Sequence, residues 1–141
     1  MTVFADSSAL VKLYADEDGA DLVRALPVFV VSAVARVEVP AALWRKSRTG
    51  EVSAQDAGIL VSAFTADWHH PAGSFVAVAL RAPVLDQAAS AAATHGLRAY
   101  DAVQLACALA ARNADPQVDV FLCFDGELRD AAGREGFSLT V

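Results

Sequence analysis

The chain has 141 residues, 55% of which are hydrophobic, and a formal net charge of −6. This length predicts a single domain over residues 1–141, and the hydrophobic fraction excludes a disordered chain. The apolar runs are too short to cross a bilayer and we expect no secretory leader, so we expect a cytoplasmic location. The acidity argues against binding nucleic acid through bulk positive charge, an argument that weakens if some acids hold metal.

The N-terminal segment predicts a strand that ends at a carboxylate. Thr2–Ala5 is apolar, Asp6 follows it, and a helical pattern runs from Ala9 to Tyr14. Chemistry in an open α/β sheet gathers beyond the carboxyl ends of the strands, which would make Asp6 a site residue. The alternative is that Asp6, Ser7 or Ser8 serves only as the N-cap of the helix.

A second strand and a long helix follow an acidic turn and a short helix at Ala20–Leu26. Val28–Val31 is a continuous apolar run, as in a strand that is covered on both faces. Ser32 is a candidate N-cap for a helix that we expect to reach Arg48. Pro40 lies inside this helix, where proline kinks a helix or moves its start.

Glu38 stands in an apolar part of this helix. Its neighbours three and four positions away are Val34, Ala35, Ala41 and Ala42. A glutamate on such a face is costly to bury without a partner, so Glu38 is a candidate site residue.

The end of the same helix carries the only dense basic patch, formed by Arg45, Lys46 and Arg48. A solvated helix C-terminus accounts for this patch. The alternative is contact with a phosphate backbone, because Arg and Lys usually make such contacts.

The middle of the chain predicts a helix, a loop, a strand and a second helix. The expected segments are Ala54–Ala66 with Ser53 as N-cap, Asp67–Ser74, Phe75–Leu80 and Pro83–Thr94. The loop contains His69 and His70, which we expect at the surface because no further ligand stands at metal-binding spacing.

A second strand that ends at a carboxylate lies near the C-terminus. Val118–Phe124 is apolar apart from Asp119, and Asp125 follows it, which repeats the arrangement at the N-terminus. Before it, Leu97–Leu109 predicts a helix that is apolar on most sides, with Asp101 near its start. A helix after Asp125 and a final strand at Phe137–Val141 complete the expected elements. Strands that alternate with helices predict an α/β fold with a parallel sheet and helices on both faces.

Four carboxylates therefore lie in apolar settings: Asp6, Glu38, Asp101 and Asp125. They can converge at one sheet edge only if something offsets their repulsion, as a hard divalent cation does. Such a site suits phosphoryl-transfer chemistry. No glycine-rich phosphate loop is present, so we expect no nucleotide cofactor. The two cysteines, Cys107 and Cys123, are expected to be buried free thiols.

Four segments carry a family resemblance, namely Asp6–Tyr14, Ser32–Glu38, Asp101–Ala106 and Asp125–Leu128 with Ala131, Ala132 and Gly136. In this order, and in a chain of this length, they resemble the PIN-domain ribonucleases and, within them, the VapC-type toxins of type II toxin–antitoxin systems. The resemblance implies one PIN domain over residues 1–141. It also implies a PIN-like three-layer α/β/α fold with a central, mostly parallel sheet of four or five strands.

The resemblance further implies a Mg²⁺- or Mn²⁺-dependent endoribonuclease. Asp6 and Asp101 would be the main metal contacts, and Glu38 and Asp125 would complete the site, partly through water. Metal-activated water would cut RNA and leave a 5′-phosphate and a 3′-hydroxyl. The implied partners are an RNA substrate, a cognate VapB-type antitoxin that blocks the acidic site, and a second copy of the chain in a homodimer.

One position departs from the family pattern. Thr or Ser often stands two residues before the last Asp of the family, and Cys123 stands there in this chain. A thiol is a poor substitute for a hydroxyl in hydrogen bonding, so Asp119 is an alternative to Asp125 for the fourth position.

Other functions fit less well. A receiver-type phosphoacceptor domain would need an acidic doublet after the first strand and a late lysine, and both are missing. A haloacid-dehalogenase-type phosphatase would need an Asp where Ser8 stands. A catalytically silent PIN-like domain, which binds RNA or an antitoxin without cleavage, is the remaining alternative.

Overall fold

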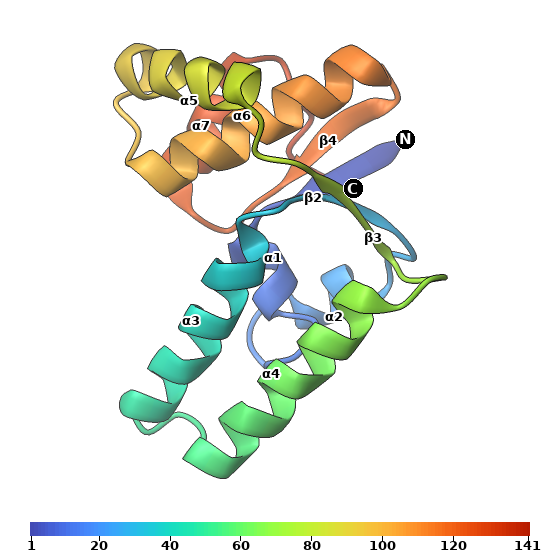
Figure 1. Ribbon diagram of the computed structural model, residues 1–141, viewed down its shortest axis with the longest axis vertical. Coiled ribbons are helices and arrows are strands. Elements are labelled where there is room, and N and C mark those ends of the chain that lie inside the picture. The colour runs from blue at the N-terminus through green and yellow to red at the C-terminus, as the bar shows by residue number, and fades with distance from the viewer.

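The computed structural model describes all 141 residues (Figure 1). Two helices follow each of the first three strands and one helix follows the fourth, which gives four strands and seven helices. The strands are β1 (Thr2–Ala5), β2 (Phe29–Ser32), β3 (Phe75–Val78) and β4 (Val118–Leu122). The helices are α1 (Ser7–Val11), α2 (Ala20–Arg24), α3 (Ala35–Arg48), α4 (Ala54–His69), α5 (Ala82–His95), α6 (Ala99–Ala114) and α7 (Gly126–Arg134). None of the helices combines the length and the apolar character that a membrane crossing requires.

The four strands form one sheet in the order β3-β2-β1-β4, and every pair is parallel. Phe4 in β1 lies opposite Val30 in β2 on one side and opposite Phe121 in β4 on the other. The chain moves outward from β1 to β2 and β3 and then returns to place β4 on the other side of β1. The strand order therefore reverses between β1 and β4, the position where open α/β sheets form a crevice at their carboxyl ends.

Helices cover both faces of the sheet. Alternate residues of β1 point to opposite faces, so Phe4 belongs to one buried cluster and Val3 and Ala5 to the other. The Phe4 cluster is completed by α5, α6 and α7, and the Val3 cluster by α1, α2, α3 and α4. Figure 1 shows these two groups of helices on either side of the sheet. The predicted α/β fold, with a parallel sheet between helical layers, is confirmed.

The predicted final strand at Phe137–Val141 is wrong. Only Ser138 pairs with the sheet, through an isolated parallel bridge to Val120. Phe137 is buried, but it packs into the core as a single side chain rather than as part of a ladder. The sheet therefore has four strands, the lower number of the prediction.

Several element boundaries also differ from the sequence predictions. Ser32 is the buried last residue of β2 rather than an N-cap, and α3 begins three residues later at Ala35. The hydroxyl of Ser32 instead accepts a hydrogen bond from the Val34 amide at 3.2 Å. The fourth helix continues through the expected loop to His69, and the first is shorter than expected because it ends at Val11. The third helix continues through Pro40 to Arg48.

Phe121 provides a test of the core on the α6 side of the sheet. Its ring is fully buried and stacks on Phe4 with ring centroids 5.3 Å apart. We expect Phe121→Ala to lower the free energy of unfolding by about 3–5 kcal/mol, because it leaves a cavity. The matched control is Ile59→Ala on α4, where the residue is 59% exposed and the expected change is within about 0.5 kcal/mol. Urea unfolding curves measure both, and equal stabilities would contradict the prediction.

Candidate functional site

The four predicted carboxylates, Asp6, Glu38, Asp101 and Asp125, line one cavity of about 430 Å³. Asp6 and Asp125 follow the carboxyl ends of β1 and β4, on either side of the point where the strand order reverses. Glu38 comes from the first turn of α3 and Asp101 from the first turn of α6. Asp119, the rival candidate, is exposed within β4 and does not line this cavity.

Asp6 is both a helix cap and a member of this cavity. Its Oδ1 accepts hydrogen bonds from the Ala9 amide at 3.0 Å and from the Ser8 hydroxyl at 2.7 Å. Its Oδ2 accepts a hydrogen bond from the Cys123 thiol at 3.1 Å. Burial raises the pKa of Asp6 to about 6, the nearby charge of Glu38 adds to the rise, and the three hydrogen bonds oppose it. The two interpretations of Asp6 from the sequence are therefore compatible.

Cys123 makes hydrogen bonds at the position where the family pattern has a Thr or Ser hydroxyl. Besides donating to Asp6, its sulfur accepts a hydrogen bond from the Asp125 amide at 3.3 Å. Burial and then the negative charge of Asp6 raise the pKa of this thiol, so it stays protonated and can donate. Cys123 thus connects the ends of β1 and β4 in place of a hydroxyl residue.

Two polar side chains hold Glu38. Ser7 donates a hydrogen bond to Glu38 Oε1 at 3.1 Å, and the Gln104 amide donates to the same oxygen at 2.8 Å. The Gln104 amide also donates to the Ser7 hydroxyl at 3.0 Å, which closes a triangle of contacts. Burial raises the pKa of Glu38 above its ordinary value, against the effect of these hydrogen bonds.

Asp101 and Asp125 complete the negative side of the cavity. Burial raises the pKa of Asp101, and the charges of Asp125 and Glu38 raise it further. Asp125 caps α7, because its Oδ1 accepts from the amides of Glu127 at 3.1 Å and Leu128 at 3.4 Å. These carboxylates therefore affect one another electrostatically through the shared cavity.

Three further residues contact the carboxylates without having been predicted as site residues from the sequence, namely Ser7, Ser8 and Gln104. A signal for Gln104 was present, because it follows Asp101 by three positions and so shares its helix face. Gln104 is only 2% exposed and its Oε1 has no hydrogen-bond partner. A buried polar side chain in an otherwise apolar helix usually has hydrogen-bond partners that account for its position. For Gln104 these partners are Ser7 and Glu38.

The donor chemistry of the cavity fits a hard divalent cation, because four carboxylates supply only oxygen ligands. Burial is the main cause of the raised pKa values of Asp6, Glu38 and Asp101, and neighbouring carboxylates add to the rise for Asp6 and Asp101. A bound cation would favour the charged forms of these groups. No three His, Cys, Asp or Glu side chains converge into a group that could hold an ion. Mutual repulsion and the hydrogen bonds to Asp6 and Glu38 favour carboxylates spread around the cavity wall.

The basic patch at the end of α3 divides into paired and unpaired residues. Lys46 binds Glu17 at 2.7 Å and Glu51 at 3.0 Å, and Lys12 binds the other oxygen of Glu17 at 3.0 Å. The charge of Lys46 is therefore paired within the protein. Arg45 lines the acidic cavity and makes no salt bridge, whereas Arg48 does not line it.

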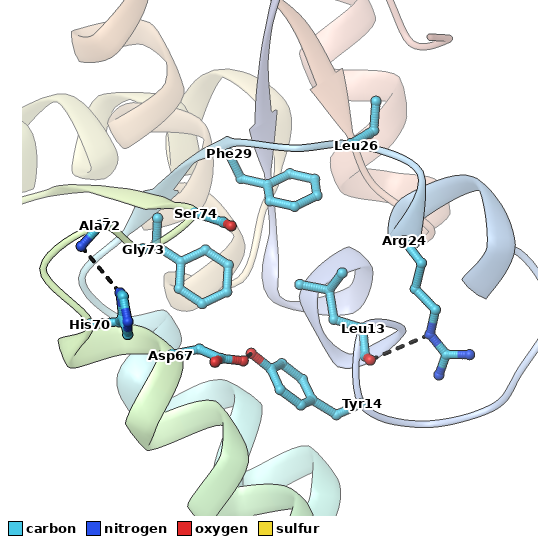
Figure 2. Close-up of a pocket in the computed structure, with 11 residues that line it drawn as sticks. Leu13, Tyr14, Arg24, Leu26, Phe29, Asp67, His70, Ala72, Gly73 and Ser74 are labelled. Carbon is cyan, nitrogen blue, oxygen red and sulfur yellow. Dashed lines mark hydrogen bonds between the residues drawn. The ribbon is translucent and has the colours of Figure 1, made fainter.

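A slightly larger cavity, of about 470 Å³, lies away from these carboxylates (Figure 2). It is found at the start of β2 and β3, where Phe29 and Phe75 line it. Two of its polar side chains bind each other, through a hydrogen bond of 2.7 Å from the Tyr14 hydroxyl to Asp67. Figure 2 shows this pair facing each other across the lower part of the pocket. The cavity lined by the four carboxylates is therefore the candidate functional site.

Comparisons with known proteins agree with this fold. The family model described as PIN domain matches residues 3–133. Among solved structures, the chain is similar to the crystal structure of Mycobacterium tuberculosis VapC20, described as a toxin that cleaves the sarcin–ricin loop. That match has 16% sequence identity and a TM-score of 0.65 and covers 97% of each chain, so it shows a common fold. No curated protein matches the chain.

Glu17 provides a test of the ion pairs beside the cavity. Burial alone would raise its pKa, but hydrogen bonds from Lys46 and Lys12 outweigh burial and hold the pKa below its ordinary value of 4.5. A lowered folded-state pKa means that the pairs stabilise the fold above the unfolded value and lose this effect as pH falls through the folded value. We expect Glu17→Gln to cost on the order of 1 kcal/mol at neutral pH.

This difference should disappear in acid. Urea unfolding of both proteins at neutral pH and below pH 4 measures it. A cost that stays constant over this pH range would show that the charge of Glu17 does not contribute.

Proposed function

Because this chain belongs to the PIN-domain family, we propose that it is a metal-dependent endoribonuclease and the toxin of a toxin–antitoxin pair. The observation that carries the proposal is the single cavity lined by Asp6, Glu38, Asp101 and Asp125. Carboxylates at the crevice of a parallel sheet are a suitable donor set for Mg²⁺ or Mn²⁺. The fold shared with the RNA-cleaving toxin VapC20 is consistent with this function.

We assign the four carboxylates different roles. Asp6 and Asp101 would make the main contacts with the ion, and Glu38 and Asp125 would complete the site, partly through water. When bound, the ion supplies activation of a water molecule and compensation of the charge that develops on the phosphate.

The surrounding side chains prepare these carboxylates. Ser8 and Cys123 fix both oxygens of Asp6, and Ser7 and Gln104 fix one oxygen of Glu38. Outer hydrogen bonds of this kind orient ligands and tune their affinity. Since the donors act on charged oxygens in a largely buried setting, they also reduce the cost of keeping those charges there.

The proposed partners follow from the same assignment. The substrate is RNA, and the acidity of the chain is no obstacle to binding it. With four of the 17 acidic residues assigned to metal, 13 remain against 11 basic residues, a balance of −2. A cognate VapB-type antitoxin would block the acidic cavity, and a homodimer would place two such cavities in one particle.

The test is RNA cleavage by purified protein free of any partner, with Mg²⁺ or Mn²⁺. We expect discrete fragments that disappear with EDTA. Asp6→Asn should lower the cleavage rate by at least about 100-fold and weaken Mn²⁺ binding in calorimetry, because loss of a ligand costs more than loss of its outer hydrogen bonds. The matched control is Asp119→Asn, whose carboxylate is exposed on β4 and lies outside the cavity, and it should behave as the wild type.

Two results would contradict the proposal. Cleavage that persists in EDTA would exclude metal dependence, and an Asp6→Asn variant with normal Mn²⁺ affinity would exclude this cavity. Intact RNA with every cation, from protein that circular dichroism shows to be folded, would favour the catalytically silent alternative that binds RNA or an antitoxin without cutting.

A further inference from the structure

A smaller cavity of about 290 Å³ lies beside the acidic cavity and is distinct from the cavity of Figure 2. We call this smaller cavity the second cavity. The two share part of their walls, namely Ser8, Val11, Ala42 and Arg45. Phe124, which directly precedes Asp125, lines only the second cavity. The two cavities are therefore adjacent, and Arg45 borders both.

The charge changes sign between the two cavities. The acidic cavity carries four carboxylates and one arginine, whereas the second is lined by the cations Lys12, Arg45 and Lys46 and the anions Glu17 and Glu51. The two lysines are paired with these glutamates. Arg45 has no such partner and borders both cavities, which makes its guanidinium the cation available to a phosphate at the boundary.

The backbone of Phe124 is tied to Asp6 by two hydrogen bonds. Its amide donates to the Ser8 hydroxyl at 2.9 Å, and that hydroxyl donates to Asp6 Oδ1 at 2.7 Å. Cys123, the preceding residue, also donates to Asp6. The residue that carries the ring is therefore held in a defined position relative to the central carboxylate.

The ring of Phe124 is in contact with neighbouring residues and is still partly exposed. The Lys12 ammonium lies 4.3 Å from the ring centroid. Gly19, with φ of +88°, approaches the ring so closely that an added Cβ would come within 2.8 Å of a ring carbon. Phe124 is nevertheless 44% exposed. A supported aromatic ring with an accessible surface is what proteins use to stack unpaired bases of RNA.

We propose that the second cavity is a nucleotide subsite for single-stranded RNA, in which Phe124 stacks on a base beside the scissile phosphate and Arg45 contacts the backbone phosphate between the two cavities. This inference rests on the proposed ribonuclease function and deepens it, because it assigns the recognition of one neighbouring nucleotide. Stacking is tolerant of base identity, so the subsite selects an unpaired base and does not select a particular sequence.

The first experiment measures kcat/KM on a single-stranded oligoribonucleotide that spans a cleavage site found in the assay above. We expect Phe124→Leu to lower kcat/KM by about fivefold to 100-fold, the range found when a stacking ring is removed. Phe124→Trp should stay near the wild type, because it keeps an aromatic face. Thermal unfolding of each variant verifies that the fold is intact.

Abasic substrates make this experiment specific to stacking. Removal of one base beside the cleavage site should lower kcat/KM for the wild type by a similar factor and should have little further effect on Phe124→Leu. If the two losses multiply, or if Phe124→Leu equals the wild type, the subsite is wrong and the ribonuclease assignment stands. If the wild type cuts no RNA, the proposed function fails and this inference fails with it.

The second experiment tests the phosphate contact without relying on cleavage. Binding of the same oligoribonucleotide, labelled with fluorescein and kept intact by EDTA, is measured by anisotropy at several salt concentrations. Arg45→Gln should reduce the slope of log K against log salt by about 0.7, the value for one contact to a single strand. The charge-matched control is Arg48→Gln, one turn along α3 and outside both cavities, which should keep the wild-type slope. Equal slopes for the two variants would overturn the role of Arg45.

Discussion

The structure depends on one buried carboxylate at the end of its central strand. Asp6 is only 4% exposed, so its charge is tolerable only where donors surround it. Those donors come from the first turn of α1 and from the end of β4, through Ala9, Ser8 and Cys123. The same hydrogen bonds thus start a helix, connect two strands and set the position of Asp6 in the acidic cavity.

The sequence was sufficient to predict the parts of the fold that have strong local signals. The strands at the two carboxylates are mostly apolar, and their alternation with helices leaves few topologies. It also located the four carboxylates of the cavity, because charges in apolar segments need a reason. The final strand was wrong because Phe137 looks the same in a sequence whether it pairs in a ladder or packs alone against the core.

The rest of the site depends on contacts between distant parts of the chain. Gln104 and Glu38 are 66 positions apart, and nothing local to either residue shows that they meet. The hydrogen bonds of Cys123 do not follow from its residue type alone, since they depend on the register of β1 and β4. Likewise, the basic patch looked uniform in the sequence, although tertiary ion pairs neutralise Lys46 and leave Arg45 free.

The single bridge at Ser138 has a consequence for how the protein behaves at high concentration. The outer edge of β4 would otherwise present unpaired amides and carbonyls, which are a template for strands of other molecules. The Phe121 amide donates to the Ser138 carbonyl at 2.8 Å, and the Ser138 amide donates to the Asp119 carbonyl at 2.9 Å. Because these two bonds occupy the middle of the edge, the C-terminal tail shields β4 from intermolecular β-sheet aggregation without adding a fifth strand.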